Sequence, residues 1–142
     1  MGNALTFDVT EPWRKGLVRL KDFLPLLPPR KDLQGYFILF HTGSDSLFGS
    51  EAYYTQESAL SEEVASFLVE RGIKGVGIDT ASVDTYPFPV HRLLLGNEIL
   101  ICEGLTNLKK LLKKEAFLTV LPLKLQGCSG SPLRVFAFIE AF

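Results

Sequence analysis

The strongest apolar run of the chain, YFILF at residues 36–40, predicts a strand that is buried on both faces. Gly35 and Gly43 bound the run, as turn residues bound strands. Weaker alternation and shorter apolar runs predict further strands, with 98–102 (EILIC) expected to be buried as well. These further strands are expected at residues 4–9, 73–78, 98–102, 116–125 and 133–139.

The pattern also predicts one well-defined helix, at residues 62–71. Val64, Phe67 and Leu68 stand at helical spacing, Ser61 is suited to the N-cap, and Gly72 is suited to end the helix. Shorter helical segments are expected, and a polar and aromatic loop is expected to form a lid or a partner contact. The helical segments lie at 21–27, 91–95 and 105–114, and the loop at 44–60.

Alternation of these elements determines the expected fold class. The helix at 62–71 passes into the strand at 73–78 through one glycine, which is typical of α/β chains. We therefore expect an α/β or α+β fold, a mixed β-sheet with flanking helices. No linker is long enough to separate two folded units, so residues 1–142 are predicted to form a single domain.

Composition narrows the classes of function. The 142 residues are 46% apolar and carry a net charge of −1 without a basic cluster, which argues against nucleic-acid binding. Apolar runs are short and interrupted, and the first residues lack the features of a signal peptide, so no membrane partner is expected. Cys102 and Cys128 are far apart and form no CxxC motif. We predict buried free thiols and a cytoplasmic protein.

His91 and Glu103 are the main candidates for chemistry. They stand twelve positions apart in a segment that is otherwise poor in reactive side chains. Imidazole and carboxylate are good ligands for zinc or manganese, but protein sites normally use three or more groups. The residue types alone therefore leave two readings open, part of a metal site or a structural histidine with an ordinary acid, and they favour the second. His41 could join the pair only if the fold brings it near.

Other motifs are weaker. Asp79 and Asp84 follow the strand at 73–78, where acids either face a cleft or cap a turn. GCSGS at 127–131 could present Cys128 as a nucleophile with His91 as its base, but a tight glycine turn explains it more simply. GVGIDT has too few glycines for a phosphate-binding loop, and a closely packed strand is the better interpretation.

Several segments, in order along the chain, carry a family resemblance. They are HTG at 41–43, RGIKGVGIDTASVD at 71–84, FPVHRLLLGNEILICEGLTNL at 88–108, LPLKLQG at 121–127 and GSPLR at 130–134. In these segments the chain resembles the cyclase family of metal-dependent hydrolases, whose best-known members are bacterial kynurenine formamidases of tryptophan catabolism. The resemblance implies a swivelling β/β/α fold and hydrolysis of an aryl formamide or cyclic amide by metal-activated water.

The resemblance also assigns site residues. His91 and Glu103 fall on two of the family's metal ligands, for zinc or manganese, whereas the family's His-x-x-x-His-x-Asp motif does not occur in the 142 residues. We therefore expect a chain that corresponds to the C-terminal two-thirds of the family domain, binds the metal weakly and turns over little alone. No catalytic residue is assigned. Exposed apolar surface is expected to make it a homo-oligomer. The alternative is a non-catalytic binding or regulatory subunit on the same scaffold.

Overall fold

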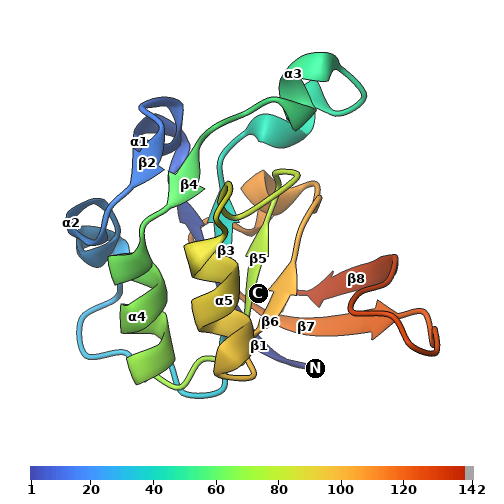
Figure 1. Ribbon diagram of the computed structural model, residues 1–142. Coiled ribbons are helices and arrows are strands. Elements are labelled where there is room, and N and C mark those ends of the chain that lie inside the picture. Colours follow the sequence, from blue (N-terminus) through green and yellow to red (C-terminus); the bar gives the residue numbers. More distant parts are fainter. Residues whose placement is uncertain (140–142) are drawn as a thin grey trace.

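A mixed six-stranded sheet is the frame of the protein, whose computed structural model describes residues 1–139 (Figure 1). Its order is β6-β5-β3-β1-β7-β8. The first four of these strands run parallel, and β7 and β8 are antiparallel to their neighbours, as expected for a mixed sheet. The strands are β1 (Gly2–Asp8), β3 (Phe37–His41), β5 (Gly75–Ile78), β6 (Leu100–Cys102), β7 (Glu115–Pro122) and β8 (Leu133–Phe138).

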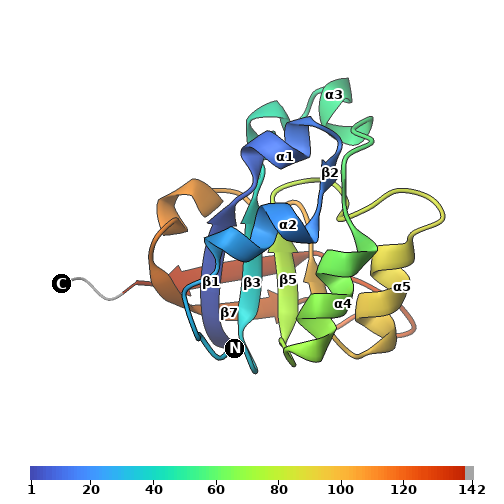
Figure 2. The same ribbon diagram turned by 90° about the vertical axis from the view of Figure 1, so that its left-hand side faces the viewer.

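Helices cover one face of this sheet, and two short helices lie near the carboxyl ends of its parallel strands (Figure 2). The helices are α1 (Thr10–Arg14), α2 (Leu20–Phe23), α3 (Glu51–Tyr54), α4 (Glu62–Glu70) and α5 (Pro89–Gly96). Figure 2 shows α2 in front of the parallel strands, α4 and α5 to their right, and α1 and α3 beyond their upper ends. β2 (Leu17–Val18) and β4 (Ala59–Leu60) form a separate two-stranded parallel pair. No helix among residues 1–139 is both long and apolar enough to cross a bilayer.

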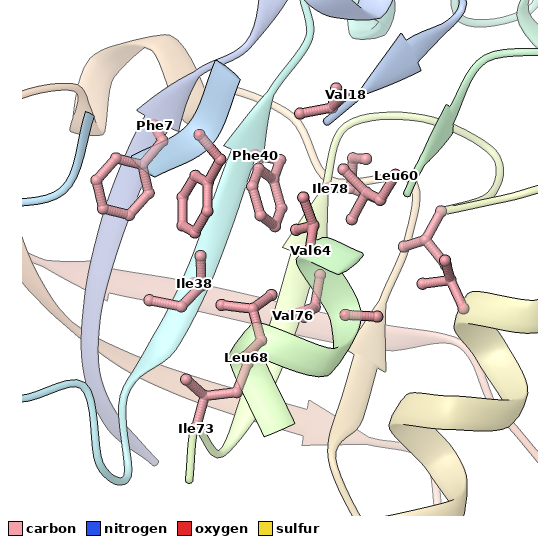
Figure 3. Close-up of a cluster of buried hydrophobic side chains, with 14 of the residues drawn as sticks. Phe7, Val18, Ile38, Phe40, Leu60, Val64, Leu68, Ile73, Val76 and Ile78 are labelled. Atoms are coloured by element: carbon pink, nitrogen blue, oxygen red, sulfur yellow. The ribbon is translucent and has the colours of Figure 1, made fainter. Parts of the chain in front are cut away.

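The main core lies between the sheet and α4 (Figure 3). Ser61 Oγ accepts a hydrogen bond from Val64 N at 3.4 Å, which caps α4 as the sequence predicts. The buried side chains of α4 then pack on the strand residues, and the ring of Phe23 from α2 lies 5.2 Å from Phe7 and 5.3 Å from Phe40. This face of the sheet is therefore firmly supported, and the predicted helix at 62–71 is confirmed.

The opposite face is covered less completely. A smaller cluster contains Phe37 and Leu39 from β3 with residues of β7 and the 3₁₀ turn Leu108–Leu111. Beside it runs an open groove of about 1180 Å³, lined mostly by apolar side chains. A Cβ on Gly77 would lie 2.5 Å from Leu39 Cδ2. The glycines of GVGI thus permit close packing, as expected for a strand and not a phosphate loop.

Three expectations need correction. The strand at 98–102 is only half-buried, because β6 is an edge strand: Ile99 and Cys102 are buried, but Leu100 is 49% exposed. The helix expected at 105–114 is only a short 3₁₀ turn, since Asn107 and Lys113 on either side have positive φ, which an α-helix cannot continue. Of the two predicted buried thiols, Cys102 is buried, but Cys128 is exposed in the β7–β8 turn.

Candidate functional site

Titratable side chains collect at one edge of the sheet, the carboxyl ends of its parallel strands. Asp8 ends β1, His41 ends β3, Asp79 follows β5, and Glu103 follows β6. The carboxyl edge of a parallel sheet is where α/β proteins usually bind ligands, because the strands stop there and loops surround an open crevice. This edge of the sheet therefore holds the candidate functional site.

Asp84 holds His91 at this edge. One carboxylate oxygen of Asp84, Oδ2, accepts a hydrogen bond from Val90 N at 2.6 Å and so satisfies the first turn of α5. The other, Oδ1, lies 2.5 Å from His91 Nδ1. Asp84 is 2% exposed, so the carboxylate is fixed by its surroundings. Asp84 therefore has two roles: it caps the first turn of α5 and it orients the ring of His91.

Glu103 faces the other nitrogen of the same ring. Glu103 Oε1 lies 3.2 Å from His91 Nε2 and also accepts a hydrogen bond from Val83 N at 2.9 Å. The hydrogen bond to Glu103 is the largest cause that raises the pKa of His91, from 6.5 to about 9, while burial opposes it and Asp84 adds to it. Between two carboxylates, the His91 ring is a doubly donating imidazolium at neutral pH.

The donor set fits part of a metal site. The structure places the two predicted residues side by side, with one nitrogen and one oxygen 3.2 Å apart, and these atom types suit zinc or manganese. Among residues 1–139, however, no group of three or more His, Cys, Asp or Glu side chains could hold a metal ion. The structure thus brings two predicted ligands into a suitable arrangement, and their metal-binding role stays a prediction.

His41 belongs to a different cluster. His41 Nδ1 lies 3.0 Å from Asp79 Oδ2, and this fully buried carboxylate also accepts hydrogen bonds from Thr42 N, Thr42 Oγ1 and Gly43 N. Within residues 1–139 no hydrogen bond or ion pair joins His41 to His91 or Glu103. Asp79 therefore holds the turn after β3, which is the capping role considered for it, and His41 does not join the candidate metal ligands.

An aromatic pocket of about 230 Å³ adjoins the His91 cluster and shares Asp84 with it. The ring of Phe88 lines the pocket and lies 5.7 Å from the His91 ring in an edge-on arrangement. The other aromatic walls are Trp13, Tyr53, Tyr54 and Tyr86. Sequence reasoning missed this pocket, although the loop at 44–60, expected to be a lid or partner contact, supplies two of its rings. The only available signal was the aromatic content of that loop.

Cys128 has no place in this site. Its Sγ contacts Gln126 O at 3.8 Å within the exposed β7–β8 turn, where Gly127 has φ 74. A glycine at positive φ is what a tight turn requires. The turn interpretation of GCSGS is therefore supported, and the nucleophile hypothesis gains nothing from the structure.

Known proteins resemble this chain throughout its length. A family model described as "Putative cyclase" matches residues 1–85. An uncharacterized protein of Methanocaldococcus jannaschii is 31% identical over 136 residues, which cover 90% of this chain and 69% of that protein.

Two solved structures share the fold. A potential metal-dependent hydrolase with cyclase activity has a TM-score of 0.80 at 27% identity and covers 99% of this chain. Isatin hydrolase A from Ralstonia solanacearum has a TM-score of 0.86 at 27% identity and covers 98% of this chain. This chain spans 66% and 60% of those two structures. The match of the family model to more than half of the residues, on a mixed sheet shared with these hydrolases, places the chain in the cyclase family.

Proposed function

We propose that this chain forms the larger part of a metal-dependent hydrolase that cleaves the C–N bond of an aryl formamide or a cyclic amide. Kynurenine formamidase-like substrates fall within this class. The observation that carries the proposal is the pair of donor atoms, His91 Nε2 and Glu103 Oε1, held 3.2 Å apart at the carboxyl edge of the sheet. The fold shared with an isatin hydrolase and a potential metal-dependent hydrolase supports it.

The residues of this chain would bind and orient the metal. A divalent zinc or manganese ion held by His91 and Glu103 would supply Lewis-acid activation of a water molecule. Asp84 accepts the Nδ1 proton of His91 and so directs Nε2 toward Glu103, as carboxylates commonly orient ligating histidines. Val83 N fixes the Glu103 oxygen. Before His91 can act as a ligand, the proton on Nε2 must leave.

The neighbouring pocket suits the aryl part of such a substrate. Five of its twelve lining residues are aromatic, and Asp84 and Phe88 connect it to the His91 ring. The larger groove on the opposite face is mostly apolar and open. Glu103 lines it, but Phe37 is the one aromatic residue of its lining within residues 1–139. We therefore assign the substrate to the smaller pocket.

The proposal includes impaired catalysis by this chain alone. Residues 1–139 contribute only two ligands to the ion, and three or more protein groups are usual for a catalytic site. We expect weak metal binding and little turnover unless further ligands are supplied. A non-catalytic binding or regulatory subunit is the alternative, and it is favoured by the same incomplete donor set.

Metal binding tests the proposal directly. Purified chain is dialysed against Zn²⁺ or Mn²⁺, and the bound metal is measured by elemental analysis for the unmodified protein and the His91→Ala variant. His91→Ala should abolish the binding, whereas Arg92→Ala, an exposed neighbour on α5, should leave it unchanged. Equal metal content in the His91→Ala variant would contradict the proposed site, and no detectable metal in any protein would favour the binding-subunit alternative.

Activity is measured separately, with formanilide and isatin as substrates in the presence of added metal. Little or no hydrolysis is expected from this chain alone. Hydrolysis at rates typical of enzymes, on the order of 10 per second, would contradict the proposed impairment. If that activity also disappeared in the Glu103→Gln variant, the assignment of Glu103 would nevertheless be supported.

We also propose that the chain self-associates through the β7–β8 hairpin. Phe117, Phe136 and Phe138 share one face of this hairpin by register and are 44–62% exposed. Exposed apolar patches of this kind favour association. Light scattering should give the mass of an oligomer that decreases in the Phe136→Glu variant but not in a variant of exposed Leu26→Glu. A monodisperse monomer would refute the proposal.

A further inference from the structure

The side-chain amide of Gln56 is held in one orientation at the wall of the aromatic pocket. Gln56 Oε1 accepts a hydrogen bond from Trp13 Nε1 at 3.0 Å and another from Ser44 Oγ at 2.9 Å. Because an indole N–H can only donate, the amide atom that faces Trp13 must be the oxygen. The position of the Gln56 amide nitrogen follows from this contact.

The amide nitrogen of Gln56 is left available to a ligand. Its two N–H groups donate to no protein atom in residues 1–139, and no buried side-chain nitrogen or oxygen in that part of the chain lacks a partner. Nε2 must therefore be reachable from solvent. Since Gln56 lines the pocket of about 230 Å³, these donors are available to a ligand in that pocket.

A network behind Gln56 keeps it in place. Thr42 Oγ1 lies 2.8 Å from Ser44 Oγ and 2.7 Å from Asp79 Oδ1, and Asp79 is fully buried. Since Ser44 Oγ gives its single proton to Gln56 and Thr42 Oγ1 gives its own to Asp79, the two residues are linked through Ser44 N, which donates to Thr42 Oγ1 at 3.1 Å. A donor that is already ordered loses little entropy when a ligand binds, so its hydrogen bond contributes more to affinity and specificity.

The aromatic walls and the volume of the pocket indicate which other chemical groups the ligand contains. Tyr53 and Tyr54 meet edge to face at 5.0 Å between ring centres, and Tyr86 and Phe88 do so at 6.2 Å. A cavity of about 150 Å³ can hold benzene, so about 230 Å³ leaves room for a ring with a small substituent. The pocket therefore suits a planar aromatic compound with an oxygen acceptor facing Gln56.

We propose that Gln56 determines ligand specificity in this pocket by donating an amide N–H to a carbonyl oxygen of an aromatic amide or lactam. The proposal deepens the proposed function, on which it rests for the identity of this ligand as the substrate. Gln56 selects the ligand and the aromatic walls hold its ring, while His91 and Glu103 lie beyond Phe88 and Asp84.

Trp13 provides the reporter for a test. It is the one tryptophan of the chain, so its indole N–H gives a single NMR cross-peak, and that N–H bonds Gln56. The full chain, isotope-labelled and kept metal-free with a chelator, is titrated with isatin, which carries ring carbonyls, and with indole, which has the ring but no carbonyl. Isatin is expected to shift the cross-peak and to bind about tenfold more tightly than indole.

The Gln56→Glu variant separates the donor role from the structural role. Glutamate keeps an oxygen for Trp13 and Ser44 but replaces the donating NH₂ group by an acceptor. Isatin affinity should fall about tenfold while indole affinity changes less than about twofold. The control is Glu57→Gln, which replaces a carboxylate by an amide at the exposed neighbouring position. It should change neither affinity. If Gln56→Glu does not fold, Gln56→Met, which also removes the donors, must show the same selective loss.

The proposal is overturned if isatin and indole bind equally to the unmodified chain, if neither binds, or if both Gln56 variants keep full isatin affinity. These outcomes are independent of the proposed metal site, because no metal is present in the titration. Conversely, metal binding that persists in His91→Ala would refute the proposed function and leave the selectivity of the Gln56 pocket as measured.

Discussion

The most specific prediction concerns the positive charge of His91, because its contribution to stability depends on the contacts of the ring with both Asp84 and Glu103. In the metal-free protein, His91 lies between Asp84 and Glu103, and its pKa is raised to about 9. A pKa that is higher in the folded than in the unfolded state stabilises the fold. This contribution is fully present below the unfolded pKa of 6.5 and is lost as the pH rises through about 9.

The structure sets the expected size of the effect. A rise from 6.5 to about 9 corresponds to about 2.5 pH units, or ~3.4 kcal/mol at about 1.36 kcal/mol per unit. The His91 side chain is 25% exposed, so solvent screening reduces the contribution. We therefore expect His91 to contribute about 1–2 kcal/mol to the free energy of unfolding at about pH 6 and almost nothing at about pH 10.

Two measurements check this prediction. The chain has two histidines, so NMR titration of their ring protons gives two curves, and the His91→Gln variant identifies the curve of His91. Urea unfolding at about pH 6 and about pH 10 then compares the free energies of the two proteins, with a chelator present. The stability advantage of the unmodified chain over His91→Gln should disappear at the higher pH.

The matched variant is Glu103→Gln, which keeps an oxygen for Val83 N but removes the charge. It should lower the pKa of His91 by about one unit or more, since an opposite charge at this distance shifts a pKa by about 1–3 units. A His91 curve with its midpoint at or below 6.5 in the unmodified chain would refute the arrangement of the three side chains.

Three predictions concern the fold. Leu68→Ala, in the fully buried part of α4, should lower the free energy of unfolding by about 2–5 kcal/mol, and the exposed Leu26→Ala by less than about 0.5; equal losses would contradict the core described above. Gly75→Ala would place a Cβ 2.7 Å from the Phe37 ring and should cost about 1–3 kcal/mol, whereas an unchanged melting temperature would refute the close packing. Asp79→Asn, which weakens a carboxylate with four donors, should cost about 2 kcal/mol by urea unfolding; a neutral effect would contradict its anchoring role.

Elements that depend on neighbouring residues were predictable from the sequence. The helix α4 followed from Ser61 and its apolar spacing, and β3 followed from an uninterrupted apolar run. Both signals are local, because a cap and a buried face repeat within a few residues. The edge position of β6 was not predictable, since its apolar residues look like those of a central strand until the strand order is known.

The candidate site, too, was partly predictable from the sequence and partly decided by the tertiary structure. The resemblance to the cyclase family selected His91 and Glu103 from the sequence, but only the packing of α5 beside β6 brings Nε2 and Oε1 to 3.2 Å. The bond between Trp13 and Gln56, 43 positions apart, depends on loops that meet only in the folded chain. Local patterns determined most of the elements, and the family resemblance selected two reactive side chains. Tertiary structure alone decided which polar groups meet, because strand order and loop path set those distances and sequence spacing does not.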